Sequence, residues 1–212
     1  MLIVEVIKMK KTSAFIFVAG LILTILISNG IAVIRDGRRL EQLRGSVLRL
    51  HILADSDSEY DQKLKLKVRD ALLECGIFEE ADSLEEAELT AAERMPEIVE
   101  TAESVLRENG CDLPVTAELA DVEFDERVYG DITMPSGEYR ALRVKIGSAQ
   151  GKNWWCVMYP PLCIPAACGD EEMDNDRSAE EIFSDEELDI LYQPKKYRVR
   201  FAIWDKIKEL TE

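Results

Sequence analysis

The stretch EYRALRVKIGSAQGKNWWCVMYPPLC, residues 138–163, contains two apolar segments separated by a turn. Apolar and charged residues alternate over residues 142–146, which is the period of a half-buried strand. Residues 147–151 begin and end with glycine and predict a chain reversal, after which residues 152–159 return as the partner strand of a hairpin. A hairpin this apolar must pack against other elements, and the rest of the chain should supply them.

Composition sets the broad class of the protein. The chain has 212 residues, 47% of them hydrophobic, which suits one globular domain of ordinary size. The net charge of −16 argues against nucleic acid as a partner and against charge-driven adsorption to an anionic membrane.

The N-terminus has the pattern of a targeting segment. Three lysines at positions 8, 10 and 11 precede an uncharged run over residues 12–34, and charged residues follow at once. This run reaches roughly 35 Å as a helix, enough to cross a bilayer core of about 30 Å. Because the basic side should stay in the cytoplasm, the remainder is expected to be exported. The sequence predicts a signal peptide or an uncleaved anchor over residues 1–34, the one expected contact with the membrane, with small residues near 30–32 as a weak cleavage site.

Beyond a tether at residues 35–45, residues 46–212 predict a single exported domain. The expected elements are strands at 46–54, 115–124 with a bulge at 120–121, 127–134, 138–146, 152–159 and 197–204, and helices at 58–76, 83–109 divided by Pro96, and 178–192. This order predicts a two-layer α+β fold, with helices packed on one face of a largely antiparallel sheet, preceded by one hydrophobic helix.

Few residues in the chain suggest catalysis. His51 is the only histidine, and the sequence lacks HExxH, CxxC and a phosphate-binding glycine loop, so no metal, cofactor or small-molecule substrate is expected. The acidic run at 170–176 lacks the spacing of a calcium loop and predicts a solvated surface. Ordinary turn chemistry accounts for Asp55, Asp57 and Asp61. A cysteine-dependent hydrolase, with Cys156 as nucleophile and His51 as base, is kept as the alternative, and a structural envelope protein as a third class.

The cysteines suggest a structural use. In an oxidising compartment, Cys156 and Cys163 enclose a short loop containing Pro160 and Pro161 that could bring the thiols within bridging distance. Two free thiols remain the alternative. Cys75 and Cys111, both after predicted helix ends, are a weaker second pair, and Cys168 is the candidate for an unpaired thiol.

Two blocks of the sequence resemble a known family. LRLHILADSDS at residues 48–58, with the helix at 61–71, and residues 135–163 resemble the most distinctive segments of the stage II sporulation protein R family. Residues 197–203 resemble its closing strand. The resemblance implies a non-enzymatic signal of endospore formation, exported from the forespore into the intermembrane space. There it would activate a membrane-embedded aspartyl protease of the mother cell that processes the sigma-E precursor.

Aromatic residues often anchor interfaces, so the second strand of the hairpin supplies the first candidates for contact with this protease. They are Asn153, Trp154, Trp155, Tyr159, Pro160 and Pro161, and a second candidate patch is Arg49, His51, Asp55 and Asp57. Strand alternation places Trp154 and Trp155 on opposite faces, so one is expected to face the core.

Overall fold

A computed structural model describes residues 2–76, 81–129, 131–160 and 183–211. The chain clusters into two units, one made of residues 1–40 with 195–212 and the other of residues 41–194. The first elements along the chain are α1 (Leu2–Arg44), β1 (Leu48–Leu53), α2 (Glu59–Glu74), α3 (Leu84–Glu93) and α4 (Met95–Glu108). They are followed by β2 (Val115–Phe124), β3 (Arg127–Tyr129), β4 (Ile132–Met134), β5 (Gly137–Ile146), β6 (Asn153–Tyr159), α6 (Asp185–Tyr192) and α7 (Pro194–Thr211).

The larger unit is built on a four-stranded sheet in the order β2-β5-β1-β6. β1 runs parallel to β5 and antiparallel to β6, while β2 is antiparallel to β5. The predicted hairpin between residues 138–146 and 152–159 is therefore wrong in its pairing, because β1 lies between its two strands. A turn specifies that the chain reverses, but it does not specify whether a third strand enters the gap.

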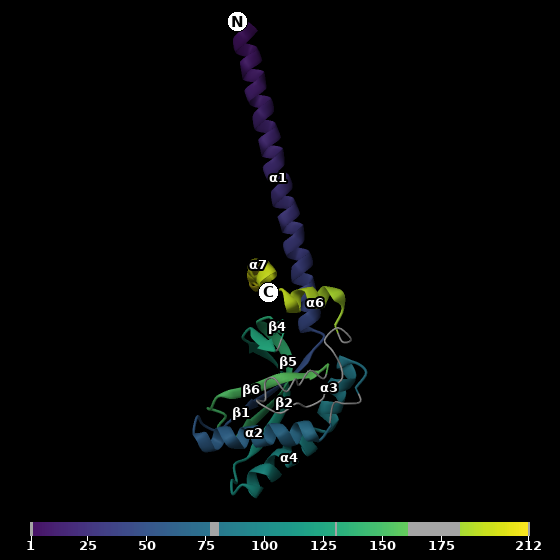
Figure 1. The fold of residues 1–212 in the computed structure, drawn as a ribbon, viewed down its shortest axis with the longest axis vertical. Coiled ribbons are helices and arrows are strands. Elements are labelled where there is room, and N and C mark those ends of the chain that lie inside the picture. Colours follow the sequence, from purple (N-terminus) through teal and green to yellow (C-terminus); the bar gives the residue numbers. More distant parts are fainter. Residues whose placement is uncertain (1, 77–80, 130, 161–182, 212) are drawn as a thin grey trace. The chain divides into compact units, whose positions relative to one another are not determined.

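The helices α2, α3 and α4 supply the second layer (Figure 1). Their apolar residues pack on the face of the sheet that carries Leu50, Ile52, Leu142 and Val144, all buried. The fold is thus α+β, with the helical layer and the N-terminal apolar helix that the sequence predicts.

Local sequence signals set the helix ends. The side chain of Ser58 accepts a hydrogen bond from the backbone N–H of Asp61 and caps α2, and Ser83 caps α3 in the same way through Glu86. Gly76 follows α2 with φ 57°, a left-handed conformation that favours glycine. Pro96 lies in the first turn of α4 and divides the helical region as predicted.

Two smaller expectations need correction. β2 pairs with β5 in unbroken register from Val115 to Phe124, so there is no bulge at residues 120–121. The segment expected as one strand at residues 127–134 contains two short antiparallel strands, β3 and β4.

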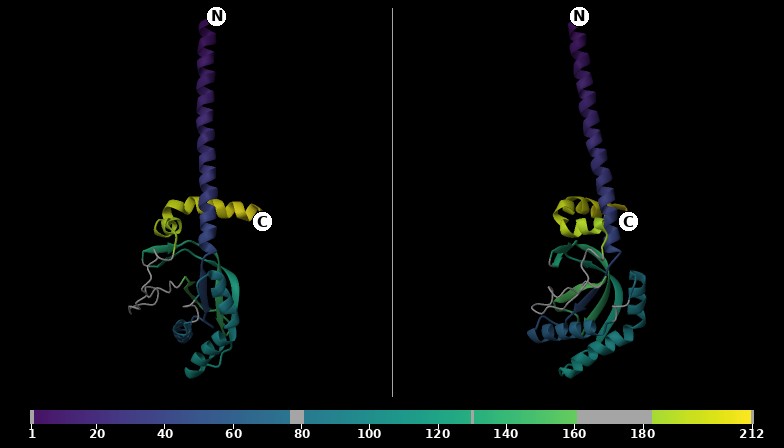
Figure 2. Two further views of the ribbon diagram at one scale, coloured as in Figure 1. Left: turned by 90° about the vertical axis from the view of Figure 1, so that its right-hand side faces the viewer. Right: turned by 45° about the vertical axis from the view of Figure 1, so that its right-hand side comes forward.

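The smaller unit contains α1 up to Leu40 and α7 from Lys195 onward (Figure 2). α1 continues as a helix through the segment expected to be a tether. Its part from Ser13 onward is long and apolar enough to cross a membrane, and it lies near the N-terminus, as a signal sequence would. The predicted closing strand at 197–204 is wrong, because these residues belong to α7. Within this unit, Arg200 of α7 forms an ion pair with the fully buried Asp36 of α1, at 2.5 Å.

Candidate functional site

The sheet face turned away from α2, α3 and α4 carries a cation surrounded by aromatic rings. Phe124, Tyr139 and Trp155, from β2, β5 and β6, meet there around the guanidinium of Arg49 on β1. These four residues, with Arg127 on β3, are called the Arg49 cluster below. Strand register brings them together, since His51 beside Arg49 pairs with Trp155 on β6.

Arg49 is fully buried, which is rare for a charged side chain. Its guanidinium carbon lies 4.0 Å from the ring centroid of Phe124, 4.3 Å from that of Trp155 and 4.8 Å from that of Tyr139. The negative faces of the rings attract the cation and partly replace the water lost on burial. One face of the Trp155 ring therefore packs against the buried guanidinium of Arg49.

Trp155 also has a cation on the side of β3. The guanidinium carbon of Arg127 lies 5.0 Å from the Trp155 ring, and Phe124 packs edge-to-face against the same ring at 5.7 Å. Trp155 is half-buried and Arg127 is exposed. The surface of the cluster thus presents an aromatic ring beside a positive charge.

His51 extends the same face but does not titrate near neutral pH. Burial, then the nearby charges of Arg143 and Arg49, lower the pKa of His51 to about 4. The side-chain amide of Asn153 lies 3.2 Å from Nε2 and forms a hydrogen bond with the neutral imidazole. His51 is therefore a neutral, packed residue in this structure.

Tyr139 is equally unsuited to proton transfer. Its hydroxyl donates a 2.6 Å hydrogen bond to the carbonyl of Pro135, and burial raises the pKa of Tyr139 to about 12. The Arg49 cluster places a buried cation among aromatic rings, but neither His51 nor Tyr139 is suited to exchange a proton at neutral pH.

Trp154 points to the other face of the sheet, as alternation predicts. It packs against the helix-side core, and the guanidinium carbon of Arg69 on α2 lies 5.1 Å from its ring. Both tryptophans are half-buried, so neither is a purely core residue. Tyr159 and Pro160, at the end of β6, are also half-buried.

Asp55 and Asp57 hold a loop in place. The carboxylate of Asp55 accepts a 2.6 Å hydrogen bond from the backbone N–H of Ser148, and that of Asp57 accepts one from Lys152 at 2.7 Å. The N–H groups of Gln150 and Gly151 donate to the backbone carbonyls of residues 55 and 54. These bonds fasten the connection between β5 and β6 across the end of β1, as turn chemistry predicts.

The proposed catalytic pair is not assembled. Cys156 pairs with Leu50 and belongs to the helix-side core, whereas His51 contacts Phe124 on the opposite face. The sheet itself separates the two side chains, so His51 cannot take a proton from the Cys156 thiol in this structure.

Cys75 and Cys111 are free thiols, so the weaker predicted pair is not formed. Pro161, Cys163 and Cys168 lie outside the described residues, and the bridge between Cys156 and Cys163 stays a prediction. In the part of the chain that the structure describes, no group of three or more His, Cys, Asp or Glu side chains is arranged to hold a metal ion.

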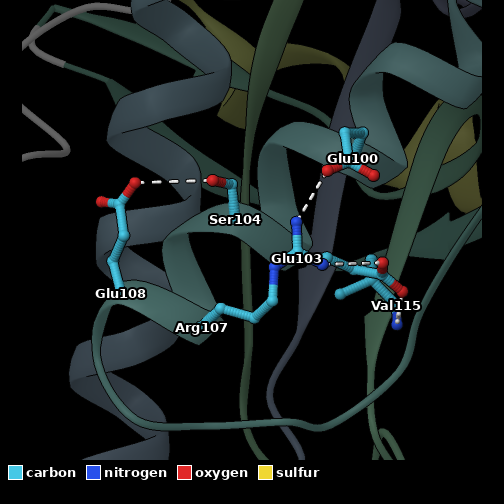
Figure 3. A network of polar contacts seen from close by, with 6 residues as sticks. All are labelled: Glu100, Glu103, Ser104, Arg107, Glu108 and Val115. Carbon is cyan, nitrogen blue, oxygen red and sulfur yellow. Dashed lines mark hydrogen bonds and ion pairs between the residues drawn. The ribbon is translucent and has the colours of Figure 1, made fainter.

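Charge also gathers on α4, away from the cluster. Arg107 contacts Glu100 at 2.7 Å and Glu103 at 3.5 Å, and Glu103 accepts from the backbone N–H of Val115 (Figure 3). The two ion pairs lie within α4 and are partly exposed, and such pairs contribute little to stability. Of these contacts, only the hydrogen bond from Val115 to Glu103 connects α4 to β2.

Sequence reasoning missed Phe124, Arg127 and Tyr139. Phe124 ends an alternating strand and Tyr139 begins one, so their places on the sheet were predictable. Their meeting depends on β1 lying beside β5, a long-range pairing that has no local signal.

Comparison with known proteins agrees with the resemblance in the sequence. A family model described as Stage II sporulation protein R matches residues 44–168, more than half of the chain. A curated relative from Bacillus subtilis (strain 168), named Stage II sporulation protein R, is 36% identical over 119 residues. That alignment covers 55% of this chain and 53% of the relative, so the chain matches about half the length of its curated relative. No solved structure matches.

Proposed function

Because the chain belongs to the stage II sporulation protein R family, we propose that it is an exported signal of endospore formation that activates a membrane-embedded aspartyl protease. The protease would lie in the mother cell and process the sigma-E precursor, and the signal would act from the forespore side, in the intermembrane space. The family match carries this proposal. The apolar N-terminal helix, compatible with a signal sequence or an anchor, supports the export step.

In this proposal, residues 46–212 form the exported part of the chain. The surface that contacts the protease is the solvent-exposed side of the Arg49 cluster. Trp155 and Arg127 present an aromatic ring and a positive charge to solvent, a combination enriched at interface hot spots. Asn153 is exposed at the start of the same strand, while Tyr159 and Pro160 at its end are half-buried, and Tyr159 packs against the helix-side core. Arg49 and His51 are buried and would support this surface from beneath.

The test of activation is co-expression of the chain with the protease and its precursor substrate in a non-sporulating host. Cleavage of the precursor should require the chain, and cleavage that proceeds equally without it would refute the proposal.

The contact surface is tested in the same assay with a matched pair of variants. Arg127→Gln should reduce precursor cleavage at least about tenfold, a loss of roughly 1.4 kcal/mol of binding. Arg107→Gln removes the same charge from the α4 network and should leave cleavage unchanged. Equal effects of the two variants would show that the contact surface is not the one next to Trp155.

A further inference from the structure

The C-terminal helix α7 has two apolar sides. Tyr197 and Phe201 are buried and Trp204 is half-buried on one side. On the other side, four aliphatic residues recur at helical spacing and are exposed by 72%, 44%, 41% and 77%, namely Val199, Ile203, Ile207 and Leu210. At 3.6 residues per turn these four span only about 80° of the helix circumference. They form a continuous apolar stripe, which is unusual on a surface that remains in water.

Contacts within the smaller unit fix α7 to one level of α1. Arg200 pairs with Asp36, whose side chain is fully buried. A Cβ atom at Gly37 would lie 2.1 Å from the Trp204 ring, so this ring rests directly on the backbone of α1. Both contacts lie just beyond Ile34, the last residue of the uncharged run. At 1.5 Å per residue, they are about 3–5 Å past the end of this uncharged run, whose 23 residues are enough to cross a membrane.

The direction of α7 also agrees with a position at the membrane surface. Figure 2 shows α7 running crosswise to α1. Membrane-spanning helices are tilted by only about 20° on average, so a helix crosswise to one lies near the membrane plane. On the helix circumference, the stripe lies about a quarter turn from the side of α7 that touches α1.

Charges around the stripe favour an anionic surface. Lys195, Lys196 and Lys206 fall within or beside the stripe on the helix circumference, whereas Asp205 lies away from it. Glu209 also lies outside the stripe but forms an ion pair with Lys206. Long lysine side chains can reach the headgroup layer while apolar neighbours enter the acyl boundary. This local pattern contrasts with the net charge of −16 for the whole chain.

We propose that α7 is an interfacial membrane helix, whose stripe of Val199, Ile203, Ile207 and Leu210 inserts into the surface of the bilayer that α1 enters. This adds a second membrane contact to the N-terminal segment. It goes beyond the signalling role and needs neither the protease nor its substrate.

The test uses the full chain reconstituted in vesicles of phosphatidylglycerol and phosphatidylethanolamine. A photo-reactive benzoylphenylalanine is placed at Ile203, or at the exposed Ala202 as the matched control one residue away. Lipid adducts, measured by mass spectrometry after illumination, should form at least about fivefold more from position 203 than from position 202. Equal yields, or adducts from position 203 to a second protein chain, would overturn the proposal.

A second arm tests the lysines. The triple variant K195Q, K196Q and K206Q, carrying the probe at position 203, should give a several-fold lower lipid yield on the anionic vesicles. On vesicles of neutral phosphatidylcholine, it should match the chain that retains the lysines. If the triple variant and the chain that retains the lysines gave equal lipid yields on anionic vesicles, the preference for an anionic surface would be overturned. Because no protease is present, failure here leaves the activation proposal intact.

Discussion

The guanidinium carbon of Arg49 lies 4.0 Å from the centre of the Phe124 ring, in a position from which no part of Arg49 reaches solvent. Rings from β5 and β6 surround the same cation, so three strands in addition to its own contribute to its burial. A planar guanidinium can stack on several rings at once and is weakly hydrated, which lowers the cost of removing it from water.

Replacing this guanidinium should destabilise the fold. Arg49→Lys substitutes a compact, strongly hydrated ammonium that cannot stack, and we expect the free energy of unfolding in urea to fall by about 1–3 kcal/mol. Arg127→Lys makes the same change at the exposed end of the cluster and should cost less than about 0.5 kcal/mol. Equal losses would show that burial among the rings does not set the requirement for arginine.

The single histidine gives a pH dependence that can be isolated. The pKa of His51 is about 4 in the folded chain and about 6.5 when unfolded, so between these values the unfolded state binds the extra proton. The contribution of His51 to the free energy of unfolding is therefore fully present above pH 6.5. It is lost as the pH drops toward 4, and the loss amounts to about 1–3 kcal/mol. His51→Gln should flatten the slope of unfolding free energy between pH 5 and 6.5. The one imidazole signal in a proton NMR titration should shift with a midpoint near 4, and a midpoint near 6.5 would contradict the burial of His51.

The elements of the larger unit were predictable where local signals are strong. Ser58, Ser83 and Pro96 mark helix boundaries through capping and the missing proline N–H, and the structure follows them. Alternation also placed Trp154 and Trp155 on opposite faces. The insertion of β1 between β5 and β6 was not predictable, because strand order depends on contacts between residues about 100 positions apart.

The strand predicted at residues 197–204 is wrong for a different reason. Over residues 197–204, apolar and basic residues alternate, and this short window fits a strand. Over the whole of α7, the apolar residues form two separate stripes on a helix, and over only two turns these stripes give the same pattern as strand alternation. A longer window that includes Ile207 and Leu210 would have favoured the helix.

The loop between β5 and β6 should be sensitive to a single methyl group. A Cβ atom at Gly147, where φ is 56°, would lie 2.3 Å from Oδ1 of Asp55. Gly110 has a similar φ of 74° with no atom within 4 Å of such a Cβ. Gly110→Ala should cost about 1–2 kcal/mol for the left-handed backbone, and Gly147→Ala should cost at least about 1 kcal/mol more. Equal unfolding free energies for the two variants would mean that Asp55 does not hold the loop closely.

The attachment of α7 to α1 depends on the absence of a side chain at Gly37. Gly37→Ala introduces a Cβ that would collide with Trp204, so α7 should detach and become at least about tenfold more sensitive to trypsin at its lysines. Gly30→Ala, where a Cβ meets nothing within 4 Å, is the matched control and should leave the cleavage rate unchanged. Unchanged cleavage in Gly37→Ala would show that Trp204 does not pack on Gly37. The position of α7 along α1 would then lose its main support.

The cysteine-hydrolase alternative predicts a reactive thiol at Cys156, and the fold predicts the reverse. Cys156 is 1% exposed in the helix-side core, and the sheet separates it from His51, so His51 cannot act on its thiol in this fold. Under reducing conditions, a maleimide reagent should label the half-buried Cys75 at least about tenfold faster than Cys156, as followed by peptide mass spectrometry. His51→Gln should leave the labelling rate of Cys156 unchanged in folded protein. Fast labelling of Cys156 that His51→Gln abolishes would require the two side chains to meet, which means a rearrangement of β1 and β6 that this fold does not contain.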